Sequence, residues 1–142
     1  MNLALSRTGR RIAGLLLLAI VAVEYGGYYL TRVSSGEAGV TEFQENFSRA
    51  GHAHAGVLVI LSLVAVILTD GTQVRGVAGW IARLAIPLAA ILMPAGFFLS
   101  SAGAGRTEPN GMIVLLWLGA ASLTVGVVTL GVLLLRTTLP GR

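Results

Sequence analysis

Four long runs of apolar residues, separated by short polar segments, set the pattern of this chain. They cover about residues 12–30, 51–68, 81–101 and 112–135. Each run is close to the roughly 20 residues that an α-helix needs to cross the hydrocarbon core of a bilayer. The pattern therefore predicts four membrane-spanning helices.

The composition points to the same class of protein. Of the 142 residues, 55% are hydrophobic and 11% are charged, and the mean hydropathy is +0.83. These values lie outside the usual range of soluble domains. Four spans use almost the whole chain, so we expect one membrane domain covering residues 1–142. The expected fold class is an all-α integral membrane protein, a four-transmembrane-helix bundle.

The first apolar run follows three arginines, Arg7, Arg10 and Arg11, as the hydrophobic region of a secretory signal does. It continues through Val23-Glu24-Tyr25 without a cleavage site of small residues. We therefore interpret it as a retained span. An even number of spans places both termini on one side of the membrane.

Arginines near the ends of the spans predict the orientation of the chain. The side of the termini carries Arg7, Arg10, Arg11, Arg75, Arg83, Arg136 and Arg142. The arginines and glutamates of the other side are Arg32, Arg49, Arg106, Glu37, Glu42, Glu45 and Glu108. The positive-inside rule places both termini in the cytoplasm and the loop of about residues 31–48 outside, with 43–47 as a short interfacial helix. A net charge of +4 spread over loops does not indicate a nucleic-acid partner.

The second apolar run opens with Gly51-His52-Ala53-His54-Ala55-Gly56, which holds the only two histidines. Neutral imidazole is the commonest ligand for transition metals and a common axial ligand for haem iron. The small neighbours leave room for a flat macrocycle or a closely packed helix. Positions i and i+2 point about 200° apart on a straight helix, so His52 and His54 cannot both ligate one centre from one regular face. We expect one imidazole to face Glu24 and the other to face a neighbouring subunit or the outer loop.

Glu24 lies inside the first run, where a carboxylate costs several kcal/mol unless it is protonated, paired or hydrated. Because the first two spans run in opposite directions, Glu24, Tyr28 and the histidines approach a common depth in the outer leaflet. These residues form the candidate site: His52, His54, Glu24 and Tyr28 for a cofactor, and His52, His54 and Glu24 as metal donors. A structural alternative stays open, in which a protonated Glu24 bonds to Tyr28 or to a backbone carbonyl and a histidine bonds to Glu45 or Glu24. A proton-relay role for the histidines is a further alternative.

The absence of cysteine limits the possible cofactors. It excludes disulfides, thiolate metal sites, iron–sulfur clusters and haem attached through Cys-x-x-Cys-His. We expect haem b or a single copper, iron or zinc ion held by nitrogen or oxygen. The chain has no phosphate-binding glycine loop with lysine, no nucleophile elbow and no Ser-His-Asp set. We assign no catalytic residue and expect a protein that is not an enzyme alone, or one that is oxidoreductase-like.

Three segments carry a family resemblance: Gly51-His52-Ala53-His54-Ala55-Gly56-Val57-Leu58, Pro94-Ala95-Gly96-Phe97-Phe98 and Pro109-Asn110-Gly111. Together they resemble small four-span bacterial membrane proteins, mostly actinobacterial, and the resemblance implies a multi-pass protein of the bacterial plasma (inner) membrane. The His-x-His at the start of a span is also remotely similar to the catalytic subunits of haem–copper oxidases, whose membrane helices hold haem and copper with histidines. The chain lacks their adjacent histidine pair and their His-Pro-Glu-x-x-x-Tyr-like segment. This second resemblance therefore implies at most one haem or metal ion per subunit or per subunit interface.

Spans three and four bear on assembly. Pro87 and Pro94 each remove a backbone hydrogen bond, which predicts a kink in the third span. Gly119, Gly126 and Gly131 predict a smooth ridge for helix contact in the fourth. In the bilayer these features favour a homo-oligomer, and a trimer would match the twelve spans of the oxidase subunit.

Three functions remain open at this point. The leading one is a haem- or metal-binding membrane protein in electron transfer, gas sensing or metal handling, with an unknown redox partner. The second is a proton-coupled small transporter or channel-like oligomer in which Glu24 titrates. The third is a non-catalytic accessory subunit of a larger membrane complex.

Overall fold

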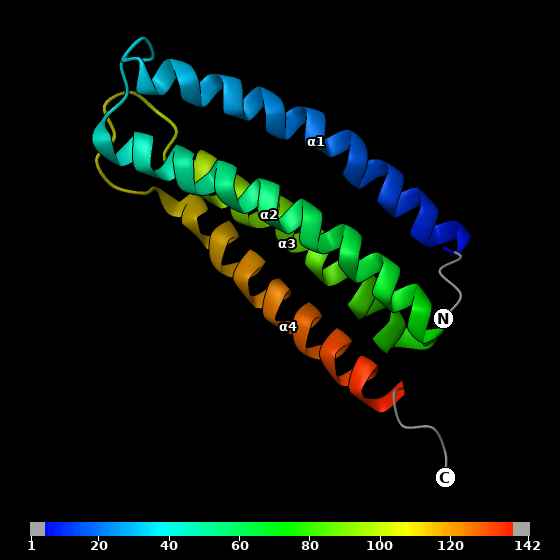
Figure 1. Ribbon diagram of the computed structural model, residues 1–142. Helices are drawn as coiled ribbons and strands as arrows, with labels where there is room; N and C mark the ends of the chain where they lie inside the picture. The colour runs from blue at the N-terminus through cyan, green and yellow to red at the C-terminus, as the bar shows by residue number, and fades with distance from the viewer. Residues whose placement is uncertain (1–4, 138–142) are drawn as a thin grey trace.

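The structure is a computed structural model that describes residues 5–137, and it consists of long helices joined by short connections (Figure 1). Its elements are α1 (Arg7–Ser34), α2 (Glu42–Thr72), α3 (Gly76–Ser100), the 3-10 turn η1 (Gly111–Ile113) and α4 (Val114–Thr137). Four helices are long and apolar enough to cross a membrane. The predicted all-α bundle of four candidate spans is therefore confirmed.

The four helices alternate in direction, so the start of α1 and the end of α4 lie at the same end of the bundle (Figure 1). We call this the terminal end, and it also holds the turn between α2 and α3. We call the opposite end, with the α1–α2 and α3–α4 connections, the loop end. α3 packs along both α2 and α4, whereas α1 packs mainly along α2. The bundle therefore has α2 and α3 at its centre and α1 at its margin.

The helix α2 begins well before the second apolar run because a capping box starts it. The Thr41 hydroxyl accepts a hydrogen bond from the Gln44 backbone N–H at 3.2 Å, and the Gln44 side-chain oxygen accepts one from the Thr41 N–H at 3.1 Å. This arrangement satisfies two N–H groups at the helix start. The segment expected as a separate interfacial helix is instead the first turn and a half of α2. Its rings, Phe43 and Phe47, lie 4.2 Å apart, and Phe47 meets Phe97 of α3 at 5.4 Å.

Many large apolar side chains point out of the bundle, as side chains that face lipid would. The helix α1 is the least buried span: 11% of its most apolar window is buried, against 33% for α2. Its exposed side chains include Leu15, Leu17, Leu18, Val21, Tyr25 and Tyr28. One face of α1 is thus available to lipid or to another protein.

Glycines allow α3 and α4 to approach closely. A Cβ placed on Gly96 of α3 would lie 2.7 Å from the Cα of Leu116 in α4, which is backbone and cannot turn away. Gly119 and Gly126 of the predicted ridge likewise lie against α3, whereas Gly131 has open space around it. The third helix also continues through both of its prolines to Ser100. Close backbone contact is the expected way for membrane helices to associate, because burial from water contributes little between them.

Gly96→Ala should destabilise the bundle by about 1–3 kcal/mol, because the added methyl group would overlap the backbone of α4. The matched control is Gly131→Ala, which has room for the methyl group and should be neutral or stabilising by up to about 1 kcal/mol. Unfolding in mixed detergent micelles, followed by circular dichroism, measures both. Equal stability of the two variants would contradict the packing described here.

Candidate functional site

His52 lies at the contact between α2 and α1, over a pair of glycines. A Cβ on Gly26 would lie 3.4 Å from its Nδ1, and a Cβ on Gly27 would lie 3.3 Å from its Cε1. The two glycines therefore form a flat seat for the imidazole ring. Among residues 5–137 neither ring nitrogen has a hydrogen-bond partner, and the only buried side-chain nitrogen or oxygen without a partner there is Nε of Arg83. The nitrogens of His52 thus remain accessible.

His54 points to a different helix. Its ring centroid lies 5.0 Å from that of Phe97 in α3, and its Nδ1 lies 2.7 Å from the carbonyl oxygen of Ala50, one turn earlier. When Nδ1 carries the proton it donates to this carbonyl, which leaves Nε2 with a free lone pair. The two imidazoles diverge as the i, i+2 spacing predicts. His54 faces α3 of the same chain, however, where a subunit neighbour or the outer loop was expected.

Glu24 and Tyr28 lie on the exposed side of α1. Tyr28 is 62% exposed and its ring lies 6.4 Å from that of Tyr25, which is also exposed. Glu24 is exposed as well, and within the described part of the chain it forms no hydrogen bond or ion pair with either histidine. The same residues contain no group of three or more His, Cys, Asp or Glu side chains placed to hold a metal ion. A single chain therefore does not gather the predicted donors into one cluster.

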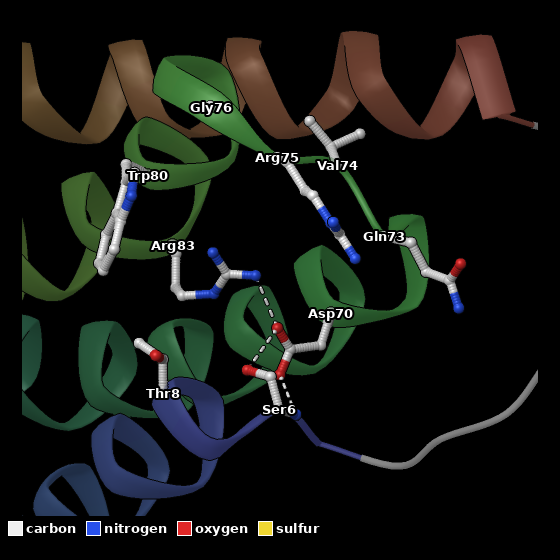
Figure 2. Close-up of a pocket in the computed structure, with 9 residues that line it drawn as sticks. All are labelled: Ser6, Thr8, Asp70, Gln73, Val74, Arg75, Gly76, Trp80 and Arg83. Atoms are coloured by element: carbon white, nitrogen blue, oxygen red, sulfur yellow. Dashed lines mark hydrogen bonds and ion pairs between the residues drawn. The ribbon is translucent and has the colours of Figure 1, made fainter.

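A second polar cluster, which the sequence analysis missed, surrounds Asp70 at the terminal end (Figure 2). One carboxylate oxygen accepts from Nη2 of Arg83 at 2.6 Å and from the Ser6 hydroxyl at 3.2 Å, and the other accepts from the Ser6 backbone N–H at 2.9 Å. The side chains of Asp70 and Arg83 are only 5% and 13% exposed. One carboxylate thus joins the start of α1, the end of α2 and the first turns of α3.

Local structure at the start of α1 prepares this contact. Ser6 is the N-cap, and its hydroxyl accepts from the Gly9 N–H at 2.9 Å while donating to Asp70. A side chain at position 9 would overlap the Asp70 carboxylate. Glycine at this position therefore allows the helix to approach the acid closely.

The sequence does contain a signal for this cluster. Asp70 is the only aspartate of the chain and ends the second apolar run, while Arg83 lies early in the third. A short turn joins these runs, so an acid and a base at their adjoining ends are candidates for an ion pair. In the sequence, Arg83 served only as an indicator of the orientation of the chain.

Asp70→Asn should destabilise the protein by about 2–4 kcal/mol, because it leaves the Arg83 guanidinium without its counter-charge in a site that water reaches poorly. The control is Glu37→Gln, which removes the exposed Arg32–Glu37 pair at 3.4 Å and should change stability by less than about 0.5 kcal/mol. Detergent unfolding curves measure both variants. Loss of the same stability in both would show that the Asp70 cluster has no special role.

The candidate residues thus fall into two groups, with His52, His54, Glu24 and Tyr28 toward the loop end and Asp70 with Arg83 at the terminal end. What is established is a small four-span membrane protein, as the four long apolar helices indicate. The resemblances to actinobacterial four-span proteins and to haem–copper oxidase subunits stay predictions. Comparison of the chain with family models, curated proteins and solved structures found no match.

Proposed function

We propose that this integral membrane protein binds haem b or a copper, iron or zinc ion in the loop-end half of its bundle, with imidazole as the ligand. The observation that carries the proposal is the hydrogen bond of His54, whose Nδ1 lies 2.7 Å from the Ala50 carbonyl oxygen. Metal-ligating histidines almost always donate their other ring N–H to a carbonyl or a carboxylate, which fixes the tautomer and orients the ring. His54 has this arrangement, and its Nε2 has no partner among residues 5–137.

The ligand count favours a group shared between copies of the chain. A structural or catalytic zinc ion takes three or four protein donors, whereas haem iron takes one or two axial ligands. The described residues of one chain offer diverging imidazoles and no cluster of three donors. A haem held by one imidazole from each of two copies, or an ion at the interface of several copies, fits these residues best. The weakly buried face of α1 leaves room for such a homo-oligomer, of which a trimer is one form.

From the arginine distribution we propose that both termini lie on the cytoplasmic side of a bacterial plasma membrane. His52 and His54 then lie in the outer leaflet, where a bound haem or copper ion can exchange electrons with a redox partner outside or bind a small gas. We propose electron transfer, gas sensing or metal handling as the role of the site. No catalytic residue is assigned.

The visible absorption spectrum of detergent-purified protein, with metal analysis of the same sample, tests this proposal. A bound haem gives a Soret band, and His54→Ala should remove most of it because the axial ligand is lost. His52→Ala is the matched variant: it should keep the band if His54 alone ligates and lose it if both histidines do. A folded wild-type protein that is colourless and metal-free after expression with added haem and metals would overturn the proposal.

A second function is favoured by the position of Glu24. This exposed carboxylate lies ten residues before Ser34, the last residue of α1, which is about 15 Å along the helix and therefore inside the apolar span. Acids at such depth usually face a protein interior or a water-filled path rather than lipid. We propose as the alternative a proton-coupled transporter or channel-like oligomer in which Glu24 titrates against a neighbouring copy. If the chain is instead an accessory subunit without chemistry of its own, another protein of the complex would cover Glu24.

Glu24→Gln should abolish pH-driven proton flux in reconstituted liposomes, because the amide cannot take up or release a proton. Glu108→Gln removes the same charge from an exposed loop position and should leave the flux unchanged. Flux is followed with a pH-sensitive dye inside the liposomes, and gel filtration checks assembly. Equal flux in the wild type and both variants would contradict a role for Glu24.

A further inference from the structure

The terminal end contains a pocket of about 590 Å³ beside the Asp70 cluster (Figure 2). It lies between the start of α1, the end of α2 and the beginning of α3. The lining residues are Ser6, Thr8, Asp70, Gln73, Val74, Arg75, Gly76, Trp80 and Arg83. The haem or metal proposal does not use this region, which lies at the opposite end of the helices from His52 and His54.

The pocket carries an excess of positive charge. Two of its lining residues are arginines and one is an acid; Figure 2 shows Arg83 of α3 bonded to Asp70 and the Arg75 side chain projecting from the turn before α3. The Asp70 carboxylate is already engaged by Arg83 and by two groups of Ser6. Arg75 is exposed and has no hydrogen-bond or ion-pair partner among residues 5–137. The pocket therefore offers a ligand one unpaired positive charge, that of Arg75.

Free donors accompany that charge. A guanidinium has five N–H donors. Arg83 uses one on Nη2 for Asp70 and one on Nη1 for the Gly79 carbonyl oxygen at 3.3 Å, so each of these nitrogens keeps a second N–H. The Thr8 hydroxyl, the Gln73 amide and the Trp80 indole are further donors in the lining. Arginine forks with hydroxyl and amide donors are typical of sites that hold phosphate groups.

The surface next to the pocket is apolar. Trp80 is 52% exposed at the end of a span, where aromatic residues mark the level of lipid headgroups. Leu84, Leu88 and Ile91 follow it at helical spacing along α3 and are 42%, 48% and 67% exposed. A cationic pocket at headgroup level thus continues into an apolar stripe that runs along a membrane span.

We propose that this pocket binds the phosphodiester group of an anionic membrane lipid, with Arg75 and Arg83 as the phosphate ligands and acyl chains along Trp80, Leu84 and Leu88. A lipid supplies both the anion and the apolar chains that the pocket and the stripe accommodate. Free phosphate supplies the anion alone.

Quenching of Trp80 fluorescence by lipids with brominated acyl chains tests the proposal. The protein carries Trp117→Phe, which leaves Trp80 as the only tryptophan, and is reconstituted in phosphatidylcholine vesicles. Brominated phosphatidylglycerol should quench at a mole fraction about tenfold lower than brominated phosphatidylcholine, the ratio expected for roughly one charge-assisted hydrogen bond. Arg75→Gln should remove this preference. Arg75 is the position to change, since α3 is not capped by its side chain, whereas changing Arg83 would break the ion pair with Asp70.

The charge-matched control is Arg136→Gln, at the same end of the bundle but outside the pocket lining, and it should keep the preference. Equal quenching by the two lipids, or equal losses in Arg75→Gln and Arg136→Gln, would overturn the proposal. Millimolar inorganic phosphate should leave the quenching by phosphatidylglycerol unchanged. Full displacement by phosphate would overturn the lipid assignment and identify a pocket for a soluble anion.

Discussion

A carboxylate shielded from water has to be compensated by donors around it, and at the terminal end Asp70 of α2 meets this requirement with donors from Ser6, at the start of α1, and from Arg83 of α3. These hydrogen bonds hold the start of α1 and the early turns of α3 against the end of α2. The loop end is joined differently. There the Gln44 side chain donates to the carbonyl oxygens of Ser101 and Gly103, at 2.9 and 2.7 Å, which joins α2 to the α3–α4 connection. The end of α1 is joined to α2 by a hydrogen bond from Arg49 to the Ser34 hydroxyl at 3.3 Å.

The four spans could be predicted from the sequence because the transfer of about 20 apolar residues into a bilayer depends little on tertiary context. The true ends of the helices could not, since they depend on caps such as the one that Thr41 and Gln44 form. Helix contacts were partly predictable. Gly119 and Gly126 lie against α3, whereas Gly131, which was predicted to belong to the same ridge, has open space around it. The spacing of glycines along one helix does not tell where the neighbouring helix diverges from it.

The candidate site, too, was predictable from the sequence only in part. The divergence of His52 and His54 follows from the rotation per residue of any α-helix. The neighbours of each histidine depend on how its helix is rotated about its axis. For His52 this rotation turns the ring toward Gly26 and Gly27, where α1 comes close to α2. That rotation sets the imidazole of His52 on the glycines and leaves the carboxylate of Glu24 exposed. The Asp70 cluster was missed for a related reason: the contact joins residues 64 positions apart and has no periodicity.

The distance along the chain between Ser6 and Asp70 has a consequence for biosynthesis. The start of α1 is made before α2, and the acid that holds it is made 64 residues later, at the end of α2. Until Asp70 has been made, the start of α1 lacks these hydrogen bonds. Asp70 reaches Ser6 at the terminal end of the bundle only once the whole of α2 is in place. The hydrogen bonds that hold the start of α1 to the end of α2 can therefore form only after the last turn of α2 has been made.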